Sequence, residues 1–219
     1  ILMTDTTRLL WIRHGLVYNP EAIIYGRLPG YRLSELGHRQ AQAAGDALHT
    51  MPLVALFSSP QLRAQQTAAH VLAHHPHLTS ALSLWLDEIH IPLEGHLMAE
   101  AAARDWDLYT DSPPEYDQPD SILARVRAFM AEVREAYAGQ TVAAVTHGDL
   151  IAFAVLWALS QPVTMAGKRQ LHTFPGFYDG YPQTASITTF TFSGAVELPI
   201  GVTYQRPYGA ELLDDSAPK

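Results

Sequence analysis

The sequence contains no cysteine, and this absence removes several kinds of chemistry at once. Disulfide bonds, zinc sites built on thiolates and cysteine nucleophiles are all excluded. Charged residues are also few, at 16% of the 219 residues, and acidic side chains outnumber basic ones by 22 to 14. A chain with a formal net charge of −8 lacks the broad basic surface that nucleic acids and anionic membranes attract. We therefore expect neither as a partner.

Long hydrophobic runs are missing too. No apolar run is long enough to cross a bilayer, and the first residues lack the basic start and apolar stretch of a signal peptide. We accordingly expect a cytoplasmic protein. Hydrophobic residues make up 47% of the chain, which suits an ordinary globular protein that can bury one core. We expect a single domain across residues 1–219.

Short apolar runs alternate with helical patterns along the chain. The runs predict strands at residues 9–12, 53–57, 141–146, 185–192 and 195–204. Apolar spacing and capping residues predict helices at 34–49, 60–73, 121–138 and 150–159, the second of them with Ser59 as N-cap and Pro60 as first residue. Strands alternating with helices predict an α/β fold: a three-layer sandwich with a mostly parallel central sheet flanked by helices.

Two segments do not fit this alternation, and we treat them as loop insertions. Residues 89–119 are rich in proline and include Trp106, Tyr109 and Tyr116, while residues 168–183 include Tyr178 and Tyr181. Long irregular segments in a compact domain tend to be lids or binding loops, so these aromatic side chains could form the walls of a pocket. The alternative is a pair of surface loops whose aromatic residues pack locally.

Three predicted strands end in residues that carry chemistry. The loops that follow them contain Arg13-His14-Gly15, Ser58-Ser59-Pro60 with Arg63 in the next helical turn, and Thr146-His147-Gly148. Ligands of parallel α/β sheets bind beyond the carboxyl ends of the strands, so these loops can converge on one site. Two arginines and two histidines suit a doubly charged oxyanion, and amide groups at the helix start after Gly148 would add affinity for it.

These blocks, in this order, resemble the histidine phosphatase superfamily, also called the phosphoglycerate mutase-like family. The similarity extends from about residue 9 to residue 159 and is most specific in four blocks. The blocks are Arg13-His14-Gly15 with Asn19, residues 58–68, Leu86-Asp87-Glu88-Ile89 with Glu94-Gly95, and Val145-Thr146-His147-Gly148. The resemblance implies a phosphatase-type member that hydrolyses a phosphomonoester.

The resemblance also implies roles for individual residues. His14 would take up the phosphoryl group as a phosphohistidine, and Glu88 would protonate the leaving oxygen. The oxygens of the phosphate would be held by a set of polar groups that needs no metal and no other cofactor. That set is Arg13, Asn19, Arg63, His147 and Gly148. Three carboxylates compete with Glu88 for the acid role: Asp87, Glu94 and Glu100.

Other functions remain possible on the sequence. A phosphoglycerate mutase would use the same His14, but cofactor-dependent mutases of this family carry a longer insert than the span from Glu88 to His147. A non-catalytic phosphate-binding protein is disfavoured because the catalytic set is complete. His70 and His74 have a spacing that can bind metal, but we interpret the patch from His70 to His77 as an exposed helix end without a metal. The expected partner is a small phosphorylated substrate, and the oligomeric state is not indicated.

Overall fold

Six strands form one mixed sheet in the order β3-β2-β4-β1-β5-β6 in the computed structural model, which describes residues 6–214. The first four strands of this order are parallel, β5 is antiparallel to β1, and β6 is antiparallel to β5. The strands are β1 (Thr6–Arg13), β2 (Leu53–Ser58), β3 (Ser80–Leu82), β4 (Thr141–Thr146), β5 (Ile187–Ser193) and β6 (Gly201–Gln205). The central part of the sheet is therefore parallel, as the sequence predicts.

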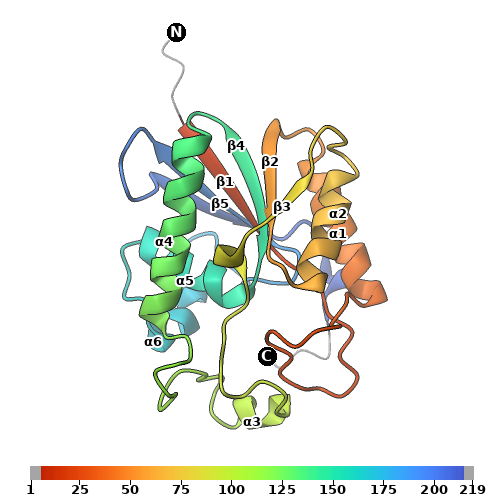
Figure 1. The fold of residues 1–219 in the computed structure, drawn as a ribbon, viewed down its shortest axis with the longest axis vertical. Helices are drawn as coiled ribbons and strands as arrows, with labels where there is room; N and C mark the ends of the chain where they lie inside the picture. Colours follow the sequence, from red (N-terminus) through yellow and green to blue (C-terminus); the bar gives the residue numbers. More distant parts are fainter. Residues whose placement is uncertain (1–5, 215–219) are drawn as a thin grey trace.

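Helices cover both faces of the sheet, which makes three layers (Figure 1). One face packs against α1 (Glu35–Leu48) and α2 (Leu62–Leu72), and the other against α4 (Pro119–Ala136) and α5 (Gly148–Ala158). Successive side chains of β1 point to opposite faces, so Leu10 and Ile12 enter one core while Leu9 and Trp11 enter the other. The predicted three-layer α/β sandwich is confirmed.

Local sequence signals predict the start of one helix correctly and miss the start of another. Ser34 caps α1 as predicted, because its hydroxyl accepts a hydrogen bond from the amide of Gly37 (3.0 Å). The predicted start of α2 is wrong: the helix begins at Leu62 rather than Pro60, and Gln61 precedes it without a side-chain cap. The Ser59 hydroxyl accepts the Gln61 amide hydrogen (3.3 Å) ahead of the helix, and it also lies 2.7 Å from Nε2 of His147.

The last strand is also shorter than predicted. Strand β6 begins at Gly201 instead of residue 195, because residues 194–200 form a turn that Arg134 holds by donating to the backbone carbonyls of Gly194 and Val196. The remaining short elements, none of which the sequence predicted, are α3 (Met98–Ala102), α6 (Met165–Arg169), η1 (Leu84–Leu86), η2 (Leu171–Thr173) and η3 (Ala210–Leu212).

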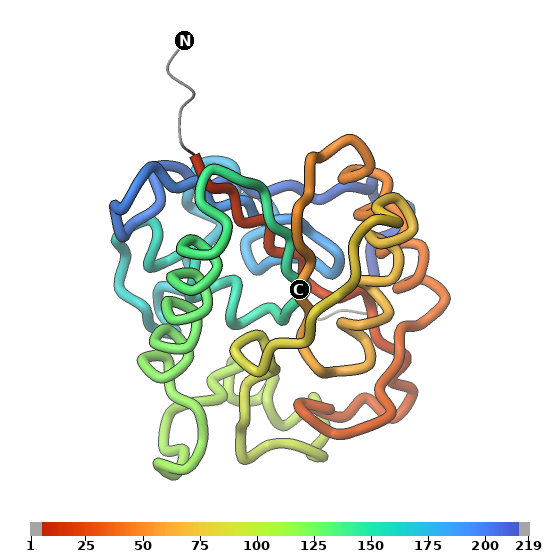
Figure 2. The backbone as a smooth tube through the Cα atoms, turned by 45° about the horizontal axis from the view of Figure 1, so that its top comes forward, coloured from red at the N-terminus to blue at the C-terminus, as the bar shows by residue number. Residues whose placement is uncertain are grey.

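The two irregular segments surround the end of the sheet where β1, β2 and β4 finish. Figure 2 shows the chain around residues 19–33 beside the segment that carries α3, and an isolated bridge joins Ile23 to Leu97 between them. The second segment begins within helix α6, which packs against α5, and continues into η2, which packs against α6. Within the described residues, no helix is long and apolar enough to span a membrane.

Candidate active site

The carboxyl ends of β2, β4 and β1, which are neighbours in the sheet, meet at one edge. The loops that leave these strands are joined by backbone hydrogen bonds. The amide of His14 donates to the carbonyl of Thr146 (3.0 Å), and the amide of Ser59 donates to the carbonyl of Val145 (2.9 Å). The ring centroids of His14 and His147 consequently lie 5.2 Å apart. The convergence that the strand ends predict is present in the structure.

The His14 ring is buried, with 2% of the residue exposed. Its Nδ1 lies 2.8 Å from the carbonyl oxygen of Gly15, so Nδ1 carries the proton and Nε2 keeps its lone pair. Burial lowers the pKa of His14 well below its usual value of 6.5, and the nearby charges of Arg63, His147 and Arg13 lower it further. The ring is therefore neutral, as a nucleophile must be.

The Arg63 side chain is fully buried and only partly satisfied. Its Nη2 donates to the carbonyl oxygen of Gly26 (2.8 Å) and lies 3.2 Å from Oε2 of Glu88, while the Tyr25 ring packs on the guanidinium at 4.7 Å. Within residues 6–214, its Nε and Nη1 have no hydrogen-bond partner. Buried donors are almost always paired in native proteins, so these two atoms indicate a place for an anion.

Arg13, at the end of β1, supplies a third such donor. Its Nη1 donates to the carbonyl oxygen of Pro182 (2.6 Å), and its Nε is buried without a partner. Among the described ion pairs none involves Arg13. Its positive charge is thus available to a ligand.

Glu88 faces both His147 and Arg63. Its Oε2 lies 3.0 Å from Nδ1 of His147 and 3.2 Å from Nη2 of Arg63. Burial alone would raise the pKa of Glu88, but the charge and hydrogen bond of His147 and the charge of Arg63 outweigh it and hold the pKa well below the usual 4.5. The carboxyl group is therefore ionised in the free protein.

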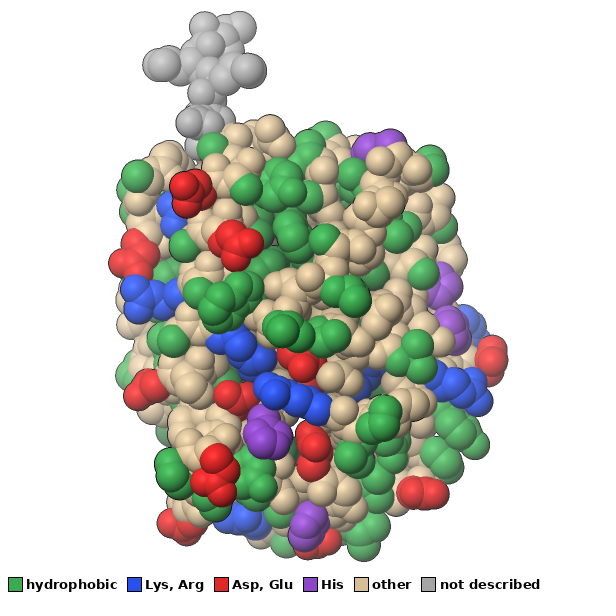
Figure 3. Space-filling view, viewed as in Figure 1, with side chains coloured by type: hydrophobic (Ala, Val, Ile, Leu, Met, Phe, Trp, Pro, Cys, Tyr) green, Lys and Arg blue, Asp and Glu red, His purple; other side chains and the backbone are tan. Residues whose placement is uncertain are grey.

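A group of ion pairs fixes the backbone around Glu88. Nε of Arg27 donates to the Glu88 carbonyl (2.7 Å), and Nη1 of Arg125 donates to the Asp87 carbonyl (2.7 Å). Both arginines also lie near Oδ2 of Asp117, at 3.2 and 3.5 Å. In the space-filling view, basic and acidic side chains lie next to one another across the middle of the face (Figure 3). Their charges largely neutralise one another, unlike that of Arg13.

The site contains the residue types of a phosphate-transfer centre, and comparisons with known proteins point to the same chemistry. A sequence profile of the histidine phosphatase superfamily (branch 1) matches residues 9–175. The chain belongs to this superfamily. The uncharacterized protein Rv0525 of Mycobacterium tuberculosis is 33% identical over 212 residues, which cover 94% of this chain and 98% of that protein.

Named phosphatases occur among the similar histidine phosphatases. The native structure of mycobacterial glucosyl-3-phosphoglycerate phosphatase Rv2419c matches with a TM-score of 0.70 and 26% identity, over 91% of this chain and 96% of that one. Fructose-2,6-bisphosphatase TIGAR of Xenopus laevis is 38% identical over 65 residues, or 29% of this chain and 24% of that protein. Superfamily membership and these neighbours support a phosphatase.

The carboxylates that compete with Glu88 for the acid role in this histidine phosphatase have other partners. Asp87 accepts the amide hydrogen of Glu88 (2.8 Å). Glu94 accepts the amide hydrogen of Arg27 (2.5 Å), and its side chain packs against Gly26. Glu100 pairs with an exposed histidine one turn earlier (3.1 Å). Glu88 is the one of the four that contacts His147 and Arg63, although its role stays a prediction.

The sequence patterns did not predict that Ser59 and Tyr25 lie beside the reacting groups. The Ser59 hydroxyl lies 2.7 Å from Nε2 of His147 and so fixes the second nitrogen of that ring. The Tyr25 ring lies 6.5 Å from the His14 ring and packs on Arg63. Ser59 directly follows a strand and lies within one of the four blocks, and this position was the available signal; nothing in the sequence around Tyr25 marks it.

Asn19 and Gly148 were predicted to bind phosphate. The Asn19 amide nitrogen donates to the Ile23 carbonyl (2.8 Å), and its oxygen accepts the Ile23 amide (3.2 Å). The side chain therefore stabilises its own turn here, and a phosphate contact would require it to rotate. Gly148 begins α5, where amide groups point out of the helix end. Both phosphate contacts remain predictions.

One group of three side chains within residues 6–214 has metal-ligand character: His14, Glu88 and His147, whose ligand atoms lie within 4.8 Å of one another. Arg63 stands among them, with Nη2 3.4 Å from Nδ1 of His147. A fixed guanidinium charge at this distance opposes a cation and favours an anion. The chemistry of the donor set thus fits phosphate better than metal.

The histidine patch is spread over separate contacts. His70 and His74 do not face one another: His70 lies 3.1 Å from a ring nitrogen of His38, and His74 pairs with Asp46 (2.9 Å). The other two, His75 and His77, have ring nitrogens against the backbone carbonyls of Leu48 and Leu53. Of the four, His77 is exposed, His70 and His74 are half-buried and His75 is buried, so the patch is less exposed than predicted.

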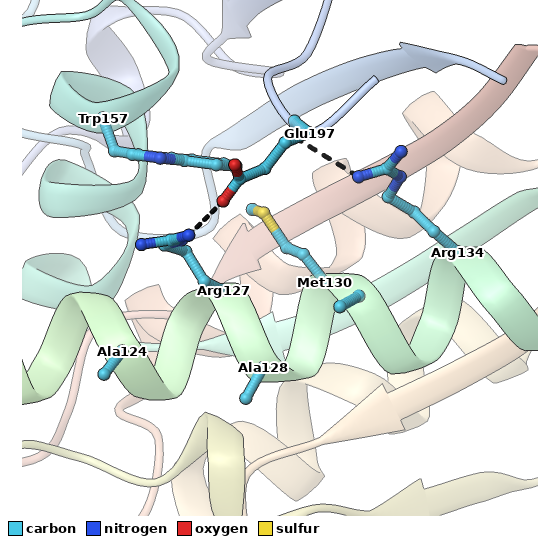
Figure 4. Close-up of a pocket in the computed structure, with 8 residues that line it drawn as sticks. Ala124, Arg127, Ala128, Met130, Arg134, Trp157 and Glu197 are labelled. Carbon is cyan, nitrogen blue, oxygen red and sulfur yellow. Dashed lines mark hydrogen bonds and ion pairs between the residues drawn. The ribbon is translucent and has the colours of Figure 1, made fainter. Parts of the chain in front are cut away.

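A separate hollow of about 390 Å³ lies on the α4 side of the molecule (Figure 4). Its lining includes Arg127, Arg134, Trp157 and Glu197. Arg127 forms an ion pair with Glu197, and Arg134 donates to the Glu197 carbonyl (3.3 Å). Both Nη atoms of Arg134 donate to backbone carbonyls, Glu197 is paired with Arg127, and no histidine is among the described residues that line it. The hollow therefore lacks the buried imidazole that the site at the strand ends contains.

Proposed function

We propose that the protein is a phosphomonoesterase that hydrolyses a small phosphorylated substrate through a phosphohistidine on His14. The observation that carries the proposal is the set of unpartnered, buried guanidinium donors of Arg13 and Arg63 beside a neutral imidazole. Planar guanidinium groups match phosphate oxygens and keep their charge. Membership of the histidine phosphatase superfamily supports the same reaction.

In the first half-reaction, Nε2 of His14 attacks phosphorus and the bond from phosphorus to the ester oxygen breaks. Arg13, Arg63 and His147 stabilise charge on the three remaining oxygens as it spreads in the transition state. A proton from Glu88 passes to the leaving oxygen, so the product departs as an alcohol.

In the second half-reaction, water attacks the phosphohistidine and returns a proton to Glu88. The bond from phosphorus to Nε2 breaks, and inorganic phosphate leaves. Because Glu88 is ionised in the free protein, it must take up a proton from solvent when substrate binds, before the first half-reaction. A phosphate dianion beside the carboxylate raises its pKa, because two neighbouring anions repel.

We further propose that the reaction needs no metal ion. Arg13 and Arg63 can balance a phosphate dianion, so a divalent cation is not needed to neutralise it. Location in the cytoplasm likewise stays a prediction, which cell fractionation checks.

The decisive experiment compares two histidine variants that keep their hydrogen bonds. In His14→Asn the amide nitrogen can replace Nδ1 against the Gly15 carbonyl, but the attacking nitrogen is lost. In the control His75→Gln, the amide can replace Nε2 of another buried histidine against the Leu48 carbonyl. We expect His14→Asn to abolish hydrolysis of p-nitrophenyl phosphate and the labelled phosphoenzyme trapped by alkaline quench, and His75→Gln to retain both. Turnover by His14→Asn near the wild-type rate would refute the covalent route.

The substrate itself is best found with a panel of phosphomonoesters. Sugar phosphates, nucleotides, phosphorylated cofactor precursors and phosphoprotein should be tested together with glucosyl-3-phosphoglycerate and fructose 2,6-bisphosphate, which the names of similar proteins suggest. Release of phosphate from 3-phosphoglycerate, without formation of 2-phosphoglycerate, would separate a phosphatase from a mutase. Phosphate binding with no turnover of any ester would indicate a binding protein.

A further inference from the structure

Asp149, two residues after His147, is a buried carboxylate at the start of α5 with three partners. Nζ of Lys168 lies 3.0 Å from each of its oxygens. The Tyr181 hydroxyl donates to Oδ1 (2.6 Å), and the Tyr109 hydroxyl donates to Oδ2. These partners come from both irregular segments, so one carboxylate ties the two segments to the edge of the sheet.

The tyrosines in this group act as donors. Burial and the neighbouring Asp149 charge raise the pKa of Tyr181 and of Tyr109 well above the usual 10, so both hydroxyl groups stay protonated. Lys168 compensates the Asp149 charge, which would otherwise repel an anion in the adjacent site. The group as a whole is satisfied and electrically neutral, which favours one fixed geometry.

The Tyr181 ring connects this group to Arg13. The guanidinium of Arg13 lies over the ring at 5.1 Å from its centroid, within the range of a cation–π contact. The next residue, Pro182, accepts a hydrogen bond from Nη1 (2.6 Å). The face of the Tyr181 ring and the Pro182 carbonyl therefore orient Arg13 and leave its charge in place. A carboxylate partner would instead cancel that charge.

Gly148 makes room for this arrangement. A Cβ atom at residue 148 would lie 2.2 Å from the Tyr181 hydroxyl, which is far inside contact distance. The glycine after His147 thus permits Tyr181 to reach Asp149 across the start of α5.

We propose that Tyr181 is a positioning residue that orients Arg13 toward the phosphoryl group of the substrate. Asp149 and Lys168 fix the ring, and the ring with the Pro182 carbonyl fixes the guanidinium. The inference rests on the proposed function in one respect: Arg13 binds the phosphate.

The test measures anion binding directly, so that it does not depend on turnover. Vanadate binding is titrated calorimetrically in the wild type, Tyr181→Leu, Arg13→Ala and the double variant. Tyr181→Leu removes both the π face and the hydroxyl, and we expect binding about tenfold weaker, in the range of cation–π contacts. In the Arg13→Ala background the same substitution should change binding less than twofold, because no guanidinium remains to be oriented.

Two further variants separate positioning from general damage. Tyr181→Phe keeps the ring and loses the hydroxyl, and it should recover part of the affinity that Tyr181→Leu loses. Tyr178→Leu changes a more exposed tyrosine of the same segment and should bind vanadate like the wild type. Thermal unfolding of each variant identifies a loss of folding. If Tyr181→Leu does not fold, vanadate binding by Tyr181→Phe is compared in the wild-type and Arg13→Ala backgrounds instead. Weakening in the wild-type background alone would support the positioning role, and equal weakening in both would overturn it.

Equal weakening by Tyr181→Leu in both Arg13 backgrounds would overturn the positioning role while leaving the proposed phosphatase intact. Absence of vanadate binding by the wild type would also overturn it, since Arg13 would then have no anion to hold. Failure to hydrolyse any ester would count against the proposed function alone, because the titration would still measure the coupling between Tyr181 and Arg13.

Discussion

Oε2 of Glu88 lies 3.0 Å from Nδ1 of His147, and the other ring nitrogen of His147 lies 2.7 Å from the Ser59 hydroxyl. Both nitrogens are therefore engaged, and the ring has a fixed orientation beside His14. The carboxylate and the imidazole shift one another's pKa in opposite directions: the charge of His147 lowers that of Glu88, while Glu88 opposes the lowering of His147 by burial. A phosphate that hydrogen-bonds to His147 must therefore displace Glu88 or Ser59 from the ring.

The pKa of His14 yields the first prediction. We expect an NMR titration of its ring to show a midpoint below 6.5, because burial and three neighbouring charges disfavour the imidazolium. Arg63→Met removes one of these charges, so its midpoint should move up toward 6.5. Arg63→Lys keeps the charge and should shift the midpoint less. A wild-type midpoint at or above 6.5 would contradict the neutral nucleophile.

The geometry of Arg63 yields the second prediction. Arg63→Lys keeps a positive charge but loses the planar donor fork, so we expect kcat/KM to fall by about a hundredfold or more. Arg134→Lys is the matched control, because this arginine binds three backbone carbonyls near the hollow on the α4 side. It should retain wild-type kcat/KM even if thermal unfolding shows a lower stability. Similar losses in both variants would mean that Arg63 acts through stability.

The strand ends made much of the site predictable. Runs such as residues 141–146 are apolar and end abruptly in polar residues, and parallel strands bring their ends to one edge whatever the details of the loops. Ser59 shows where this reasoning fails. Its hydroxyl accepts the Gln61 amide hydrogen, as the local sequence predicts, but the helix begins only at Leu62. The same hydroxyl also binds the ring of His147, 88 residues away, and no local pattern could reveal that tertiary contact.

The group around Asp149 could not be predicted for a related reason. Lys168 and Tyr181 are 19 and 32 residues away, and neither shows a spacing that relates it to the carboxylate. The sequence identified residues 89–119 and 168–183 as irregular segments with aromatic residues. It contained no signal that Tyr109 and Tyr181 meet at one buried acid, because irregular segments have no periodicity from which to derive a contact.

Independence from metal ions yields the third prediction. We expect kcat and KM for p-nitrophenyl phosphate to stay unchanged after EDTA treatment and removal of the chelator. The reason is that Arg63 already provides a fixed positive charge among His14, Glu88 and His147. Activity that disappears with EDTA and returns with magnesium or zinc would show that this group, or the histidines at positions 38 and 70, holds a required metal.

The role of Glu88 yields the last prediction. If it protonates the leaving oxygen, Glu88→Gln should slow an alkyl phosphate far more than p-nitrophenyl phosphate, because an alkoxide is a poor leaving group while p-nitrophenolate departs largely unaided. Glu94→Gln and Asp87→Asn are the controls, and they should slow the two substrates equally if at all, since their carboxylates bind backbone amides. The ratio of kcat/KM for the two esters is the measured quantity, and it cancels general damage to the site. Selective slowing of the alkyl ester by Glu94→Gln, with equal slowing by Glu88→Gln, would transfer the acid role to Glu94.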